Sequence, residues 1–558
     1  MFAAAALLAV LVLRWPDALH TPFLNDDYLF LDRTRDAALP ALWGFGDLAF
    51  HWWRPWSRET HYWALQEVAG ANAAAFHAAN AVLWCAVLAA WWAVARRVAG
   101  AHAAAWAVAA CAALAAWSLP LLWVAGVQDL WMLLWSLLAM LAWGADRRAP
   151  ALACWVLAML SKETAAPLPA VLLAYDLMLE QRRARVALRR IAPFVALALV
   201  WAIAHPRLGG VLLRDVVVEH AHDPTRLSPG LALLRGKLVA LNADRWPDPV
   251  HGWAALAGPA LALTVALVVL AGALRGVPAA RRAPAPFARA DVARFALAWA
   301  VAGLLPLLLP GLRFHAYYAA FAAFGVLLLV APVLGAHAGV AAGSLAVLAL
   351  LGTARDATPS HDWGEAAYQR RAAGFHRALR NDLLRKLPEP GAHARLYFVR
   401  VPDRVGLVQG DTPALRVWYD DPTLSGGFYS AYAPRVTGAP AGRDWFFRLD
   451  SLAGWIEVRA GAEDVLAAMA ANPRWRTDHR TLAAMFAAAG DFTAAAIEHA
   501  KLAEALPLSS DDAFDAAAAW SAAGDSARAL AWACTAAARP GARPELVAAA
   551  HDAGLLPR

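Results

Sequence analysis

The sequence predicts a mainly α-helical protein that crosses a membrane many times and carries a soluble region at its C-terminal end. Of the 558 residues, 61% are hydrophobic and only 17% are charged, whereas ordinary globular domains have about 25% charged residues. The apolar residues form long runs before residue 353, and a membrane-spanning helix needs about 20 such residues. From residue 353 onward the composition is that of a soluble protein.

About eleven spans are predicted. The first apolar run, residues 1–13, is short. No positive charge precedes it, so we interpret it as a first span that continues toward Leu19, or as a start placed too late, rather than as a signal peptide. The other spans are expected near residues 73–95, 101–124, 128–144, 149–160, 165–179, 191–204, 253–274, 294–309, 314–334 and 339–352.

Arginine clusters predict the orientation. They lie at residues 96–97, 147–148, 182–190 and 275–294. With eleven spans and the N-terminus inside, all four fall on cytoplasmic loops, as the positive-inside rule requires. We therefore expect a multi-pass protein of the cytoplasmic (inner) membrane with its C-terminal region outside. This arrangement accounts for the net charge of +7 without nucleic-acid binding. The four cysteines suggest neither a disulfide framework nor a metal knuckle.

Three regions are predicted. Residues 1–352 form the multi-span domain with a first outer loop at 15–73, residues 353–460 a small soluble α/β region, and residues 461–558 a helical region. Residues 395–400 and 455–459 have the composition of strands. Ala-Ala-Gly-Asp at 488–491 recurs at 522–525. This 34-residue shift resembles tetratricopeptide repeats; the alternative is an alanine-rich bundle with chance similarity.

Polar residues gather at the predicted outer ends of the spans. Ionisable groups beside apolar spans are costly and usually line a functional cavity. In the predicted topology, which depends on other residues, all of these groups lie at one membrane face. The candidates for a site are Asp26, Asp27, Arg54, Arg58, Glu59, His77, Asp129, Lys162, Glu163 and Arg313.

These residue types suit transfer chemistry at a lipid headgroup. Arginine and lysine bind phosphate through charge-assisted hydrogen bonds. A carboxylate, Asp26 or Asp27, is able to take the proton of an attacking hydroxyl. Adjacent carboxylates can also raise one another's pKa or hold a divalent cation. These residues therefore leave open whether the site binds a metal ion. Alternatively, Asn25-Asp26-Asp27 caps a short helix, and His77 is a satisfied core histidine.

Several segments resemble a known family. Asn25-Asp26-Asp27, Arg54-Pro55 with Ser57-Arg58, and Phe76-His77 with Asn80 resemble the first extracytoplasmic loop of GT-C superfamily glycosyltransferases. The pattern is most similar to the branch related to protein O-mannosyltransferases and to multi-span proteins with tetratricopeptide repeats. Further similar segments are Gly126–Leu130, Ser161–Thr164 and Pro310–Arg313 with Tyr317-Tyr318. Gln128 departs from the family, which often has a basic residue there.

The resemblance implies a GT-C fold, a monosaccharide donor linked to polyprenyl phosphate, and inverting transfer (hexosyl or pentosyl) to a hydroxyl acceptor at the outer face. The acceptor, a protein, lipid or glycan, is left open. Asp26 or Asp27 would be catalytic. Arg54, Arg58, Lys162 and Arg313 would bind phosphate, and Glu59, His77, Asp129 and Glu163 would orient substrate.

The C-terminal repeats would bind the acceptor or a protein partner of a cell-envelope pathway. Two rival functions are a transporter or flippase of envelope glycolipids, and a non-catalytic repeat-bearing membrane scaffold. A transporter would place charges near the bilayer midplane and show duplicated spans, and the sequence shows neither clearly.

Overall fold

The structure is a computed structural model. It describes residues 2–46, 48, 52–205, 228–245, 253–276, 287–308, 314–360, 362–399, 412–428, 440–458, 479–480, 483–484, 486–488, 490–507 and 509–556. The chain forms two compact units that divide between Ala378 and Leu379.

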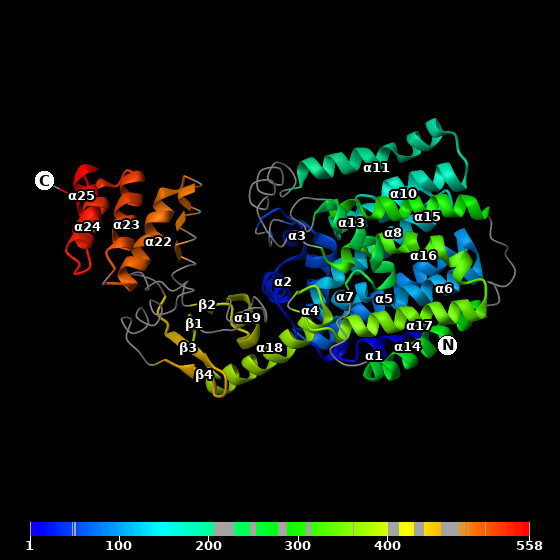
Figure 1. Cartoon of the computed structure of the whole chain (residues 1–558), viewed down its shortest axis with the longest axis horizontal. Helices are drawn as coiled ribbons and strands as arrows, with labels where there is room; N and C mark the ends of the chain where they lie inside the picture. The colour runs from blue at the N-terminus through cyan, green and yellow to red at the C-terminus, as the bar shows by residue number, and fades with distance from the viewer. Residues whose placement is uncertain are drawn as a thin grey trace. The chain divides into compact units, whose positions relative to one another are not determined.

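The first unit is a bundle of apolar helices (Figure 1). Among the described residues, seven helices are long and apolar enough to cross a membrane, which confirms a multi-pass helical protein. The count of eleven spans stays a prediction. The seven are α5 (Ala73–Ala99), α8 (Val127–Gly144, with the turn from Val124), α11 (Ala184–Ala204), α14 (Trp253–Arg275), α15 (Arg289–Gly303, continued to Leu308), α16 (Ala320–Leu334, with the turn from Ala316) and α17 (Ala338–Ala357).

Shorter helices complete this unit. Two apolar ones are α1 (Phe2–Arg14) and α9 (Arg148–Met159). The others are η1 (Ala18–His20), α2 (Asp26–Thr34), α3 (Leu39–Leu42), the π-helical turn η3 (Pro55–Thr60), α4 (His61–Ala69), η5 (Val124–Gly126), η6 (Glu163–Ala165), α10 (Leu168–Ala174), η7 (Tyr175–Leu179), α13 (Pro229–Leu238), η8 (Val239–Leu241), η10 (Leu305–Leu308) and η11 (Ala316–Ala319).

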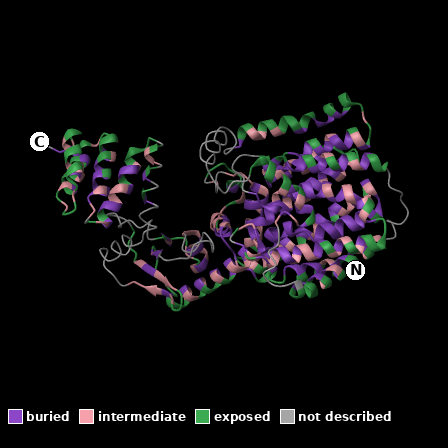
Figure 2. Cartoon of the chain, in the orientation of Figure 1, coloured by how far each residue is buried: buried purple, intermediate pink, exposed green. Residues whose placement is uncertain are grey.

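Small residues allow the inner helices to pack closely. A Cβ at Gly325 of α16 would collide with the backbone of Ala300 in α15, and one at Gly303 would lie 2.7 Å from Cα of Ala322. Without a hydrophobic force between helices in lipid, such close contacts hold a bundle together. Figure 2 shows that α11 is mostly exposed, whereas neighbouring helices are largely buried.

The segment expected as one span at 101–124 is broken. It consists of α6 (Ala101–Ala112), the turn η4 (Ala115–Trp117) and α7 (Ser118–Leu122), with a bend of 52° between the two halves. Asn242 satisfies the backbone at the break. Its Oδ1 accepts from the N–H of Ala115 at 2.7 Å, and its Nδ2 donates to the carbonyls of Ala113 and Leu348 at 3.0 Å each. A break at membrane depth is tolerated only when its freed polar groups find partners.

The second unit contains a four-stranded sheet of order β2-β1-β3-β4. Strand β1 (Arg395–Val399) pairs in parallel with β2 (Ser425–Phe428) and β3 (Asp444–Asp450), and β3 pairs antiparallel with β4 (Gly454–Glu457). The two strands expected from the sequence are therefore present. The parallel pair β1–β2 is connected through α19 (Thr412–Tyr419). The helix α18 (Ala366–Lys386) precedes β1.

The last helices repeat a local geometry. They are α22 (Phe492–Ala505), α23 (Asp511–Ala522), α24 (Ser526–Ala537) and α25 (Pro544–Asp552). Gly490 and Gly524 both have φ of +81°. The following residues, Asp491 and Asp525, both accept from the backbone N–H three residues later. The two sequence copies thus form the same turn and N-cap, while the assignment to tetratricopeptide repeats stays a prediction.

Candidate functional site

The carboxylate of Asp27 is completely enclosed. The side chain has 0% of its surface exposed. Its Oδ2 accepts from the N–H of Leu24, and its Oδ1 accepts from Tyr62 Oη and the N–H of Ala125, each at 2.8 Å. Burial raises the pKa of Asp27 to about 8. Asp27 therefore joins α2 to α4 and to η5, and an external hydroxyl has no approach to it.

Asp26 has a different environment although it is the next residue. It begins α2 and is only half-buried. No side chain in the described part of the chain donates a hydrogen bond to its carboxylate. Burial raises the pKa of Asp26 to about 6, while the charges of Arg58 and Arg54 act to lower it. Asp26 is thus a partly exposed carboxylate on which the charges of two arginines act.

The N-capping interpretation applies only in part. Asn25 occupies the N-cap position of α2 with φ of +48°, but its side chain makes no capping hydrogen bond. Instead, Asp27 reaches back to the N–H of Leu24. The helix N-terminus also places a partial positive charge beside Asp26.

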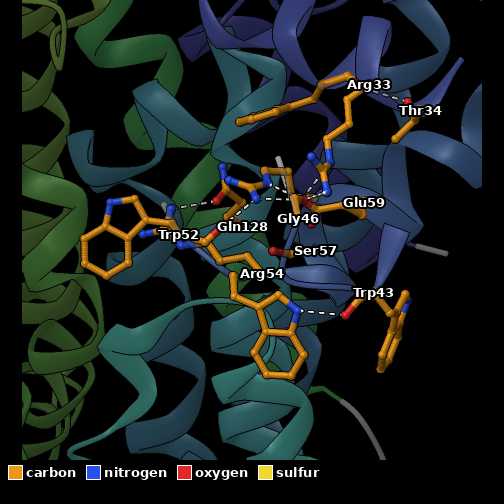
Figure 3. A network of polar contacts seen from close by, with 12 residues as sticks. Arg33, Thr34, Trp43, Gly46, Trp52, Arg54, Ser57, Glu59 and Gln128 are labelled. Carbon is orange, nitrogen blue, oxygen red and sulfur yellow. Dashed lines mark hydrogen bonds and ion pairs between the residues drawn. The ribbon is translucent and has the colours of Figure 1, made fainter. Parts of the chain in front are cut away.

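Arg54 is held by a fork of hydrogen bonds. Its Nε donates to Glu163 Oε2 at 2.9 Å, its Nη2 to Glu163 Oε1 at 2.5 Å, and its Nη1 to Gln128 Oε1 at 2.7 Å. The guanidinium also lies over the ring of Trp52. Gln128 thus helps to fix the orientation of Arg54, as Figure 3 shows.

Lys162 and Asp129 form a second pair. Lys162 Nζ donates to both carboxylate oxygens of Asp129 at 2.8 Å. The same ammonium lies over the rings of Tyr317 and Tyr318, at 4.6 and 5.0 Å from their centroids. The structure therefore brings together segments that are far apart in the sequence, around residues 54, 129, 162 and 317.

Arg58 and Glu59 form an inner network rather than an open site. Arg58 Nε and Nη2 donate to Glu59 Oε1 at 2.8 and 2.6 Å, and Nη2 also donates to the carbonyl of Trp52. Arg33 lies 3.7 Å from the same carboxylate oxygen (Figure 3). Arg58 and Glu59 are each 1% exposed. These contacts connect residues within the segment 33–59.

His77 lies in the core. It is 1% exposed, and its Nδ1 lies 3.1 Å from the carbonyl oxygen of Leu121. Asn80, one turn later, donates to the carbonyls of Pro120 and Val124. This position agrees with the alternative in which His77 is a packed histidine. Arg313 lies outside the described residues.

Two contacts of the site were not predicted from the sequence. Tyr62 donates to Asp27 across 35 residues of sequence, and His205 Nε2 accepts from the N–H of Trp53 across 152. No local spacing signals either contact. The one signal for Tyr62 in the sequence is its position within the predicted outer loop at 15–73, which also contains several of the candidate site residues.

The described residues define a polytopic helical membrane protein with a charged cluster beside the α2 N-terminus. No protein-family model matches the sequence, and neither does any curated protein. A solved structure with partial similarity is ArnT from Cupriavidus metallidurans bound to undecaprenyl phosphate. It is 17% identical, with 76% of this chain and 85% of that chain covered and a TM-score of 0.37.

Proposed function

We propose that the chain is an integral-membrane glycosyltransferase of the GT-C type. It transfers one monosaccharide from a polyprenyl-phosphate donor to a hydroxyl acceptor on the extracytoplasmic side. The observation that supports this most is the contrast between the two adjacent carboxylates. Asp27 is enclosed by three hydrogen-bond donors, while Asp26 is partly exposed and lies within the electrostatic influence of Arg54.

Asp26 is the general base in this proposal. A base works best when its pKa lies near the operating pH. With a pKa of about 6, Asp26 is mostly ionised at pH 7 and still basic enough to accept a proton. Asp27 is a positioning residue, because it fixes the first turn of α2 and so the place of Asp26.

Arg54 and Lys162 are the phosphate ligands. An arginine has five N–H donors and a lysine three. Among the described residues, Arg54 uses three donors on Glu163 and Gln128, and Lys162 uses two on Asp129. Both therefore keep donors for an anion. Glu163 and Asp129 orient these cations, so the phosphate meets groups already in place.

The reaction is a single displacement. The acceptor oxygen forms a bond to the anomeric carbon of the sugar while its proton passes to Asp26. The bond between that carbon and the phosphate oxygen breaks, and the electron pair leaves on the phosphate. Arg54 and Lys162 stabilise the charge that develops there. Attack opposite the leaving group inverts the anomeric centre.

The test uses the full chain in nanodiscs with a panel of radiolabelled polyprenyl-phosphate monosaccharides and cell-envelope extract. Release of polyprenyl phosphate is followed for the parent, Asp26→Asn and Asp27→Asn. We expect Asp26→Asn to lower kcat by about 10²- to 10⁴-fold, as for loss of a general base, with an unchanged unfolding temperature. We expect Asp27→Asn to lower the unfolding temperature, because its amide would face the N–H of Leu24.

Consumption of no donor by the parent would reject the proposal, as would an Asp26→Asn variant as active as the parent. The same assay with EDTA decides whether a divalent cation takes part. The helices after residue 461 are proposed to bind the acceptor or a protein partner, and their removal would then weaken acceptor use without affecting donor binding.

A further inference from the structure

The first part of α18 belongs to the same compact unit as α2. That unit extends to Ala378, so it includes residues 366–378 of this helix. Buried side chains recur here every four positions, at Tyr368, Ala372 and His376, and residues with this spacing lie on one face of a helix. This face of α18 is therefore packed against another part of the first unit.

The packed face of α18 covers the residues that precede and begin α2. Leu24 lies in one buried cluster with Tyr368 and Ala372. Farther along α18, His376 Nε2 lies 2.6 Å from the hydroxyl oxygen of Tyr28, which is a hydrogen-bonding distance. Tyr28 and His376 are each 2% exposed, so water does not compete for this hydrogen bond. The position of α2 therefore depends directly on α18.

Two arginines extend the contact between α18 and the segment before α2. Arg370 Nε lies 3.2 Å from Asp17 Oδ2, and Arg377 Nη2 donates to the carbonyl of His20 at 2.6 Å. Both contacts are exposed to solvent, and exposed polar pairs contribute little to stability. The buried hydrogen bond of Tyr28 should therefore have the larger effect on the position of α2.

Tyr28 and Asp26 project from opposite sides of α2. Successive residues of an α-helix are about 100° apart around its axis, so positions 26 and 28 differ by about 200°. Asp27, between them, is held by Tyr62 and by the N–H of Ala125. The first turn of α2 is thus fixed on two sides, and the remaining side carries the partly exposed Asp26.

We propose that His376 is a positioning residue for the transfer reaction: through Tyr28 it holds α2 so that Asp26 can take the proton of the acceptor hydroxyl. This inference rests on the proposed function. His376 contacts the side of α2 opposite the base, so it takes no part in the bond changes. Its effect is on the place of the base, and a small displacement of a catalytic group lowers the rate strongly.

The kinetics of donor consumption separate positioning from binding. We expect His376→Leu and Tyr28→Phe each to lower kcat about tenfold while KM for the donor changes by less than about twofold, because Arg54 and Lys162 lie on other segments. The double variant should be no slower than either single one, since each substitution removes the same contact. His376→Gln should keep about half of kcat or more, because its amide is able to donate or accept in place of Nε2.

Leu383 provides the matched control, because it is buried on the same helix but belongs to the second unit. Leu383→Ala should lower the unfolding temperature, measured by differential scanning fluorimetry, and leave kcat unchanged. A parental kcat in His376→Leu would overturn the proposal, and so would a His376→Gln variant as slow as His376→Leu. An equal loss of kcat in Leu383→Ala would also overturn it, because the effect would then follow from general destabilisation.

Hydrogen exchange followed by mass spectrometry tests the same contact without turnover. We expect the amides of α2 to exchange about fivefold faster in His376→Leu than in the parent, while those of α5 stay unchanged. His376→Gln should match the parent. Unaltered exchange in α2 with an active parent rejects the positioning role but not the transferase. Faster exchange in α2 with an inactive parent rejects the transferase but not the contact between α18 and α2.

Discussion

The hydroxyl of Tyr62 donates a hydrogen bond to Asp27 Oδ1 at 2.8 Å, and this contact ties α4 to the first turn of α2. Both groups are buried, with Tyr62 and Asp27 each 0% exposed. The position of the neighbouring Asp26 therefore depends on a phenol 35 residues away in the sequence.

Tyr62→Phe should destabilise the first unit. The substitution removes one of three donors to a buried carboxyl group, which costs about 1 to 3 kcal/mol. We expect a lower unfolding temperature in detergent, measured by differential scanning fluorimetry. Tyr368→Phe is the matched control, since no hydrogen bond from its hydroxyl to a described residue is present. A parent-like temperature in Tyr62→Phe would contradict the anchoring role of Asp27.

The transferase reaction should be lost at acidic pH. The pKa of Asp26 is raised to about 6, mainly by burial, and a general base works only when ionised. As the pH falls through 6, Asp26 takes up a proton, so kcat/KM should decrease about tenfold per unit below that value and level off above it. Rates are measured from pH 4.5 to 8.5. A break near 4, or activity that rises in acid, would exclude Asp26 as the base.

The Lys162–Asp129 pair allows a structural role to be separated from donor binding. Lys162→Met leaves the carboxylate of Asp129 buried without its partner, which costs about 3 to 5 kcal/mol. We expect the double variant Lys162→Met with Asp129→Asn to recover the unfolding temperature, while KM for the donor stays at least tenfold above that of the parent.

The buried pair Arg14–Asp356, with Arg14 Nε 3.0 Å from Asp356 Oδ2, is the matched control. Arg14→Met with Asp356→Asn should show the same pattern of stability without any change in KM. Donor binding restored to the parent level in the Lys162 double variant would remove Lys162 from the phosphate site.

Asn242 should be essential for the break between α6 and α7. It has φ of +55° and makes three hydrogen bonds to backbone groups. At about 1 kcal/mol each, their loss in Asn242→Ala should cost about 3 kcal/mol, in addition to backbone strain. Asn242→Gly relieves the strain without restoring the bonds. We expect unfolding temperatures in the order parent, Gly, Ala, and a Gly variant equal to the parent would refute the capping role.

Composition and periodicity predict the helical membrane bundle, and charge placement predicts that Arg54, Lys162, Glu163 and Asp129 converge. The structure pairs them as Arg54–Glu163 and Lys162–Asp129. The different burial of two adjacent aspartates is not predictable in this way. It depends on Tyr62 and on the N–H of Ala125, 98 residues from Asp27, and such contacts leave no local pattern.

The bend after α6 was not predicted from the sequence, for a related reason. An alanine-rich apolar run at 101–124 fits a straight span equally well. The residue that makes the break tolerable, Asn242, lies 127 residues from Ala115 and between hydrophobic neighbours. In the sequence, a polar residue at this position is as consistent with a loop as with a hydrogen-bond partner for a broken helix.

The same contact has a consequence for the biogenesis of the protein. The residues of the break leave the ribosome 127 residues before Asn242 does. During that interval the carbonyl of Ala113 and the N–H of Ala115 lack their final partner, and lipid supplies none. The hydrogen bonds that complete the bend can therefore form only after residue 242 has been synthesised, so the final shape of the segment at 101–122 depends on a part of the chain made much later.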